Sequence, residues 1–309
     1  SMVFSLVSTP VSAAETGQLT NPPTSTEELS SPESISGNEA ASALNGLSVL
    51  AANGEAEVTT ASELTGALAD SSISRITLKG DIDIGSTLTV NRTVTLDLNG
   101  CVLKMTGSDS VIKVEADGDL TIQDRNTTTQ HKFNPHCKYL TWYIDMWELD
   151  NGGSEIVSGG VITGGGGDQS NGGGVLVAGG TLVMAGGSIV GCSAMSRGGG
   201  VCNNGTFIMS DGMIKGCTSP DGQYASGGGV RNSNQFTMTG GMIGDPDNEN
   251  DASHVYNTSS QETTLTISGN AKIYTDITNV GILNADGGEI AGTMTNDTNR
   301  YGNRVGGGD

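Results

Sequence analysis

Residues 198–217 read GGGVCNNGTFIMSDGMIKGC, and related stretches lie on both sides of them. A triple glycine followed by valine also starts at Gly172 and at Gly227, so the three copies are 26 and 29 residues apart. Weaker copies begin near Val255 and Ile282. Self-similarity with a period of this length predicts a repeat fold, in which each copy forms one structural unit.

Each copy contains three short apolar stretches separated by Gly, Asn or Asp. Three strands in about 25–30 residues are typical of one coil of a β-solenoid. The side chains within a strand alternate between two faces, and aligned residues of successive coils stack. We therefore expect Phe207 to lie in the core between Leu182 and Phe236, and Ile208 to face outward.

An asparagine follows the aligned Val or Ile by two positions in four copies, at Asn203, Asn232, Asn257 and Asn284. An amide both donates and accepts hydrogen bonds, so stacked asparagines can form an inward ladder. Glycine suits turns that need a positive φ or a close approach of two backbones. These patterns predict an all-β chain folded as a parallel β-helix.

The chain divides into segments of different composition. Residues 1–14 look like the remnant of a signal peptide, and residues 15–57 are expected to be a disordered acidic linker. The β-helix is predicted over residues 58–296, with an aromatic insertion at 123–154 and a tail at 297–309. Within the first coil, TASELTGALAD (residues 60–70) reads as a short amphipathic helix that caps the open edge of the solenoid.

Composition excludes two classes of partner. The chain has 309 residues, 48 of them glycine, and a net charge of −20 from 14 basic and 34 acidic residues. Such a charge repels phosphate backbones, so we expect no nucleic-acid partner. No run of 18 apolar residues occurs, so we also expect no membrane insertion.

The repeat resembles a known family. The coil GGGVLVAGGTLVMAGGSIVG (residues 172–191) and the opening ITLKGDIDI (residues 76–84) are similar to the right-handed parallel β-helix, or pectin-lyase-like, surface proteins of Gram-positive bacteria. The resemblance implies right-handed coils, the hand that the crossover rule also favours. It further implies an extracellular location, secreted or at the bacterial cell surface. The family fold includes both repetitive adhesins and polysaccharide lyases or hydrolases, so the fold alone does not choose a function.

The outward strand faces contain no two carboxylates on neighbouring coils, which a glycosidase would need. Arg231 and Lys215 stand on these faces without acidic neighbours, and we expect both to be solvated. The favoured hypothesis is therefore a non-enzymatic, adhesin-like protein that binds a glycan or a host protein. The alternatives are a carbohydrate-active enzyme on the same fold (a polysaccharide lyase or glycoside hydrolase) and a purely structural surface spacer.

The aromatic insertion is the candidate binding site. It contains both tryptophans of the chain, and Trp and Tyr are enriched where proteins bind partners. The predicted binding residues are Trp142 and Trp147 as anchors, with Tyr139, Tyr143 and Asp145. The alternative is that the insertion packs its aromatic side chains onto the side of the solenoid, where they would be structural.

One loop offers a candidate metal site. Asp245, Asp247, Glu249 and Asp251 alternate as carboxylates do in the first half of an oxygen-ligand calcium loop. The glycine at the sixth position and the glutamate at the twelfth are missing, so a solvated acidic loop is the preferred interpretation. Calcium is the only cofactor that the sequence suggests.

Five cysteines leave at least one unpaired. Cys192 and Cys217 occupy the same position in successive coils and should stack. They could form a disulfide or remain two free thiols that pack like small apolar side chains; the second interpretation is preferred.

Overall fold

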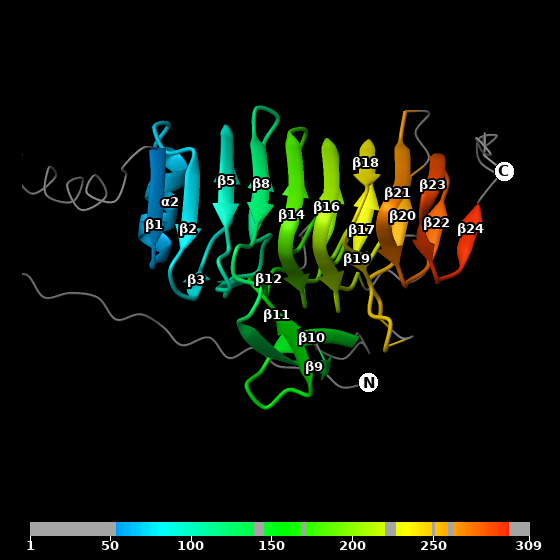
Figure 1. Ribbon diagram of the computed structural model, residues 1–309, viewed down its shortest axis with the longest axis horizontal. Coiled ribbons are helices and arrows are strands. Elements are labelled where there is room, and N and C mark those ends of the chain that lie inside the picture. The colour runs from blue at the N-terminus through cyan, green and yellow to red at the C-terminus, as the bar shows by residue number, and fades with distance from the viewer. Residues whose placement is uncertain are drawn as a thin grey trace, which may run out of the picture.

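The computed structural model describes residues 54–138, 145–167, 171–219, 227–248, 251–258 and 262–296. In these ranges the chain winds through successive coils, and each strand pairs in parallel with its counterpart in the next coil. Figure 1 shows the strands side by side, from β1 at the N-terminal end of the stack to β24 at the other end. The predicted all-β fold with parallel sheets of a β-helix is confirmed.

Two parallel sheets and one antiparallel sheet account for the described strands. Sheet A contains β1 (Glu55–Val58), β2 (Arg75–Leu78), β3 (Ile82–Ile84), β5 (Thr93–Asp97), β6 (Val102–Met105), β8 (Asp119–Gln123), β12 (Val161–Thr163), β14 (Thr181–Val190), β16 (Thr206–Lys215), β18 (Gln235–Met238), β19 (Met242–Ile243), β21 (Thr264–Ile273) and β23 (Ile282–Ile290). Sheet B contains β4 (Leu88–Val90), β7 (Ile112–Val114), β13 (Val175–Val177), β15 (Val201–Asn203), β17 (Val230–Asn232), β20 (Val255–Asn257), β22 (Ile277–Asn279) and β24 (Met294–Asn296). The antiparallel sheet C contains β9 (Gln130–Lys138), β10 (Asp145–Leu149) and β11 (Glu155–Ser158).

The core consists of side chains stacked along the axis of the coils. Leu182, Phe207, Phe236 and Leu265 pair in register through four coils, and all four are buried. The rings of Phe207 and Phe236 are stacked, with centroids 4.6 Å apart and planes at 7°. Ile208 faces the other way and is only partly buried. The predicted strand register is therefore confirmed.

The asparagine ladder runs through the core, but its last residues are not the ones that the sequence predicts. The amide of Asn203 donates to Asn232 over 2.7 Å, and Asn232 donates to Asn257 over the same distance. The next rungs are Asn279 and Asn296, at 2.7 and 3.0 Å. The ladder is thus longer than the sequence predicts.

The prediction that Asn284 continues the ladder is wrong. Asn284 lies in β23, pairs with Thr266 of sheet A and is exposed. Its neighbour Leu283 is buried against Leu265. The reason is that the last coils are shorter: the rungs after Asn257 are 22 and then 17 residues apart. An alignment at the longer period therefore lands on a strand of the other sheet.

The predicted helix is present as α2 (Ala61–Ala69), beside β1 and β2 at the N-terminal end of the stack (Figure 1). It begins with a capping box, in which Glu63 N–H donates to the Thr60 hydroxyl while the Glu63 carboxylate accepts from the Thr60 N–H. Its Leu64 and Leu68 are buried in the core of the first coils. At its C-terminal end Arg92 donates to the carbonyls of Ala67 and Leu68, which fixes the helix on the stack.

Glycines are required where neighbouring coils approach most closely. A Cβ atom added at Gly199 would lie 2.2 Å from the carbonyl oxygen of Thr218 and 2.6 Å from that of Gly228. The triple glycines therefore allow backbone of one coil to sit directly on backbone of the next.

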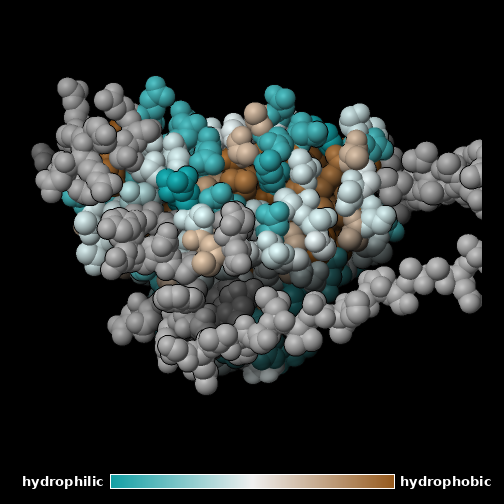
Figure 2. Space-filling view, turned by 180° about the vertical axis from the view of Figure 1, so that it is seen from behind, coloured by the Kyte–Doolittle hydropathy of each residue, from teal (hydrophilic) through white to brown (hydrophobic). Residues whose placement is uncertain are grey.

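The described surface is mainly polar. In Figure 2 hydrophilic residues gather along the upper edge, and apolar residues are visible in a band beneath them. Among the described residues only three large apolar side chains are exposed, those of Ile156, Met195 and Met294. None of the described helices is long and apolar enough to cross a membrane.

Candidate functional site: a glycine-floored groove

The strands of sheet A bend at a row of stacked glycines. Gly187, Gly212 and Gly241 have φ values of +74°, +94° and +79°, a region that L-residues with side chains rarely adopt. A Cβ at Gly212 would lie 2.6 Å from the carbonyl oxygen of Gly187, and one at Gly241 would lie 2.8 Å from that of Gly212. The bend therefore needs glycine. Because glycine has no side chain, the surface over the bend is hollowed.

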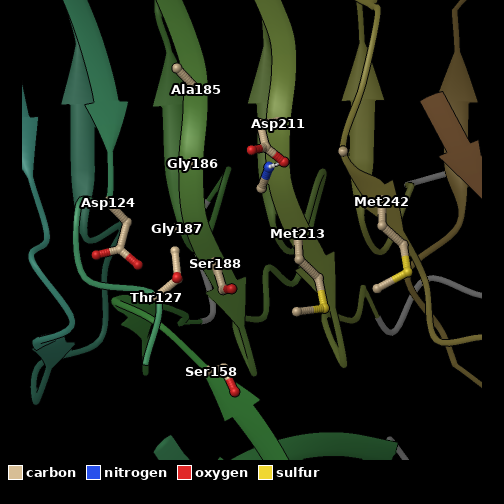
Figure 3. Close-up of a pocket in the computed structure, with 12 residues that line it drawn as sticks. Asp124, Thr127, Ser158, Ala185, Gly186, Gly187, Ser188, Asp211, Met213 and Met242 are labelled. Carbon is tan, nitrogen blue, oxygen red and sulfur yellow. Dashed lines mark hydrogen bonds between the residues drawn. The ribbon is translucent and has the colours of Figure 1, made fainter. Parts of the chain in front are cut away.

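A groove of about 310 Å³ lies over these glycines (Figure 3). Asp124 and Thr127 lie at one end, Met213 and Met242 lie at the other, and Asp211 and Ser158 lie on opposite sides. The full lining consists of Asp124, Thr127, Ser158, Ala185, Gly186, Gly187, Ser188, Asp211, Gly212, Met213, Gly241 and Met242. The groove is therefore formed jointly by the bend of sheet A, by Asp124 and Thr127 at the start of the insertion, and by Ser158 at the end of β11.

The two carboxylates of the groove differ in their surroundings. Asp124 accepts the N–H of Gly100 on Oδ1 and the N–H of Gly160 on Oδ2, each over 2.7 Å, so it joins the coil to the insertion. Asp211 is exposed, and its Oδ1 accepts the N–H of Gly212 over 2.8 Å. Within the described part of the chain Oδ2 of Asp211 accepts no hydrogen bond, so it is open to a ligand.

The groove can therefore bind a molecule with both hydroxyl groups and an apolar face. The Asp211 carboxylate accepts hydrogen bonds, and the hydroxyls of Ser158 and Ser188 can donate or accept them. The thioethers of Met213 and Met242 are partly exposed and offer a soft apolar contact. Sequence reasoning missed this site because the glycine runs were interpreted only as turns; their repetition at the bend is the signal that could have revealed it.

The structure places Trp147 in a packed cluster. Its side chain is 2% exposed and packs with Phe133, Val157, Val161 and Val190. Its backbone N–H donates to the carbonyl of Gly216 in the coil beneath. For Trp147 the structure agrees with the alternative of an insertion packed onto the solenoid, because the buried ring is not open to a ligand.

The structure describes little of the other predicted binding residues. Tyr139, Trp142 and Tyr143 lie outside the described residues, and so does the side chain of Asp145, whose backbone starts β10. The hypothesis that they bind a partner stays a prediction.

Lys215 is buried, which contradicts the expectation that it is solvated. Its Nζ lies 4.3 Å from the ring centroid of Trp147 and 3.2 Å from Oδ2 of Asp245. Strand alternation does turn Lys215 outward, but the insertion folds back over this face and covers it. Arg231, the second cation expected to be solvated, is partly buried, and its guanidinium lies 5.8 Å from the ring centroid of Tyr256 on the next coil.

The candidate calcium ligands are bonded to protein groups. Asp251 accepts the N–H of Gly216 on both oxygens at 3.1 Å and that of Ser253 on Oδ1 at 2.9 Å. Asp245 and Asp251 are buried, so the interpretation as a solvated loop is wrong for these two; the loop folds back against the end of β16. Glu249 lies outside the described residues, and the described ones include no group of three ligand-type side chains arranged for a metal. Calcium binding by this loop, including by Asp247, stays a prediction.

The stacked cysteines are free thiols. Cys192 and Cys217 are both buried, and their sulfurs donate to the carbonyls of Ile162 and Ile189 respectively. Burial, and then the neighbouring Cys192, raise the pKa of Cys217 well above its ordinary value. The preferred interpretation of two packed thiols therefore agrees with the structure.

The stacked parallel strands with a surface groove define a parallel β-helix with a candidate ligand site on its side. Residues 55–158, from β1 to the end of β11, match a family described as a pectate lyase-like adhesive domain. The comparison indicates an adhesin-like role, a surface location and a binding partner of some kind. No curated protein and no solved structure gave a significant match.

Proposed function

We propose that this chain is a secreted or cell-surface, non-enzymatic adhesin and that its glycine-floored groove binds a glycan or a host protein. The observation that carries this proposal is the exposed carboxylate of Asp211 beside two partly exposed thioethers, over a floor without side chains. A sugar ring offers hydroxyl groups to the carboxylate and a C–H face to the sulfur atoms. The adhesive family matched by residues 55–158 supports the same function.

The charge of the molecule narrows the class of ligand. With a net charge of −20 the chain repels anionic polysaccharides at long range. A neutral or cationic glycan, or a basic protein surface, is therefore the expected partner. The insertion, with Tyr139, Trp142, Tyr143 and Asp145, would extend the same binding surface, because Thr127 of the insertion lines the groove.

A glycan array with matched variants tests this proposal. Asp211→Ala removes the open carboxylate, and loss of a hydrogen bond to a charged group should weaken binding about tenfold or more. Asp286→Ala is the control, since Asp286 is also exposed on sheet A but lies outside the groove. Equal binding by the wild-type chain and Asp211→Ala would refute the groove as the site.

The same proteins test the non-enzymatic part of the proposal. The chain would be incubated with a panel of polysaccharides and assayed for new reducing ends and for absorbance of unsaturated products. We expect neither signal. Product formed by the wild-type chain and lost in Asp211→Ala would show a carbohydrate-active enzyme instead.

A further inference from the structure

A buried amine and a buried carboxylate meet between two neighbouring coils. Lys215 ends β16, and Asp245 lies two residues beyond β19, the strand that pairs with β16. Their Nζ and Oδ2 atoms are 3.2 Å apart, and the side chains are only 8% and 6% exposed. An ion pair so far from water loses much of its hydration, so its charged form is costly.

The surroundings of this pair exclude water. The ring of Trp147 lies over the amine, with 4.3 Å between Nζ and the ring centroid. Asp251 accepts the N–H of Gly216, the residue next to Lys215, so the chain around Asp251 packs against the end of β16.

We propose that Lys215 and Asp245 condense into an intramolecular isopeptide bond. Nζ gives one proton to Oδ2 of Asp245, and its lone pair then attacks Cγ, so that a C–N bond forms and the C–Oδ2 bond breaks. The departing oxygen leaves as water, with that proton and a second one lost by the nitrogen, and nothing is oxidised or reduced.

The site favours this reaction because the two groups are already in contact within a rigid sheet, so little translational or rotational freedom remains to be lost. The product is an amide that links two coils covalently and holds the residues around Asp245 on the side of the stack.

The intact mass of the full-length denatured chain tests the proposal, after the cysteines have been reduced and blocked. We expect a mass below that of the sequence by one water molecule, and a digest that yields one branched peptide containing both Lys215 and Asp245. Lys215→Arg keeps a cation at this position but cannot form the bond, so its full mass should return.

Folding is checked in each variant by far-UV circular dichroism. Lys272 and Glu289, which pair on neighbouring coils at 4.0 Å but are half-exposed, are the internal control and should remain unlinked. A folded wild-type chain with its full mass would overturn the proposal. A deficit that survives in Lys215→Arg, or a branch at Lys272, would also overturn it.

Discussion

Asn232 shows how one buried polar side chain can connect three coils. Its Nδ2 donates to Oδ1 of Asn257 over 2.7 Å and to the carbonyl of Thr264 over 2.9 Å, while its Oδ1 accepts from Asn203. The side chain is fully buried, so every bond it makes replaces water that has been removed. The ladder therefore fixes the register between successive coils in a core that is otherwise apolar.

Asn232→Ala should lower the free energy of unfolding by about 2–4 kcal/mol, because it leaves buried acceptors on Asn257 and Thr264 without this donor. Asn284→Ala is the matched control. Asn284 is exposed on sheet A, so its replacement should change stability by less than about 0.5 kcal/mol. Urea unfolding of both variants measures the difference, and equal losses would contradict the ladder described above.

Phe207→Ala should destabilise the chain much more than Ile208→Ala. Phe207 is completely buried and stacked on Phe236, and replacing a buried Phe by Ala typically costs about 3–5 kcal/mol. Ile208 lies on the opposite face and is only partly buried. The comparison is made by denaturant unfolding, and a larger loss for Ile208→Ala would indicate the opposite strand register.

At the scale of elements, α2 is held at its start by charge as well as by packing. The N–H of Thr59 donates to the Glu63 carboxylate over 2.7 Å and is the main reason that the pKa of Glu63 lies below its ordinary 4.5. A carboxylate in the first turn also interacts favourably with the helix dipole. Protonation of Glu63 therefore weakens the cap.

Glu63→Gln should make the chain less stable than wild type near neutral pH, by about 0.5 kcal/mol. Because the folded state lowers the pKa of Glu63, the stabilisation is present above pH 4.5 and is lost as the pH falls through the folded-state pKa. The two melting temperatures should thus converge on acidification. A difference that is constant, or that grows at low pH, would show that Glu63 does not act through its charge.

The insertion is docked on the solenoid by Trp147, and the fluorescence of that residue reports on the contact. In Trp142→Phe the only remaining tryptophan is Trp147, which is 2% exposed. We expect blue-shifted emission with little quenching by acrylamide, because the ring is covered by protein. Red-shifted, easily quenched emission from a folded variant would mean that sheet C is detached from the coils in solution.

The position of a residue could be predicted from the sequence where its environment depends on its own coil. It could not be predicted where that environment depends on a distant part of the chain. Alternation placed Phe207 inward, because the period of a strand is a local property. The burial of Lys215 depends on Trp147, which precedes it by 68 residues and comes from an insertion without the repeat pattern. The groove depends on stacked positive-φ glycines together with Asp124 and Ser158, which no single copy of the repeat reveals.

At the scale of the whole molecule, each coil contacts chiefly the coils before and after it. In such a quasi-one-dimensional architecture, stability is close to a sum of coil and interface contributions. The position of Asn284 was mispredicted for a related reason: stacking requires equivalent strands, not equal numbers of residues between them.

A chain that ends at residue 275 should therefore keep its upstream coils folded. The truncation removes β22, β23 and β24, which pair with β20, with β21 and with one another but not with β14 or β16. Hydrogen exchange should show unchanged protection of the amides in β14 and β16, and reduced protection in β20 and β21. Loss of protection throughout the molecule would indicate a single cooperative unit instead.

The unequal spacing of the ladder rungs has a consequence for how such a chain can diversify. Successive asparagines are 29, 25, 22 and 17 residues apart, although the distances between their amides barely change. Residues can thus be gained or lost in the connections while the axial repeat of the stack is preserved. Mutations can change these connections, and thereby the surface that the molecule presents to its partners. Selection for folding meanwhile acts on a few inward positions per coil.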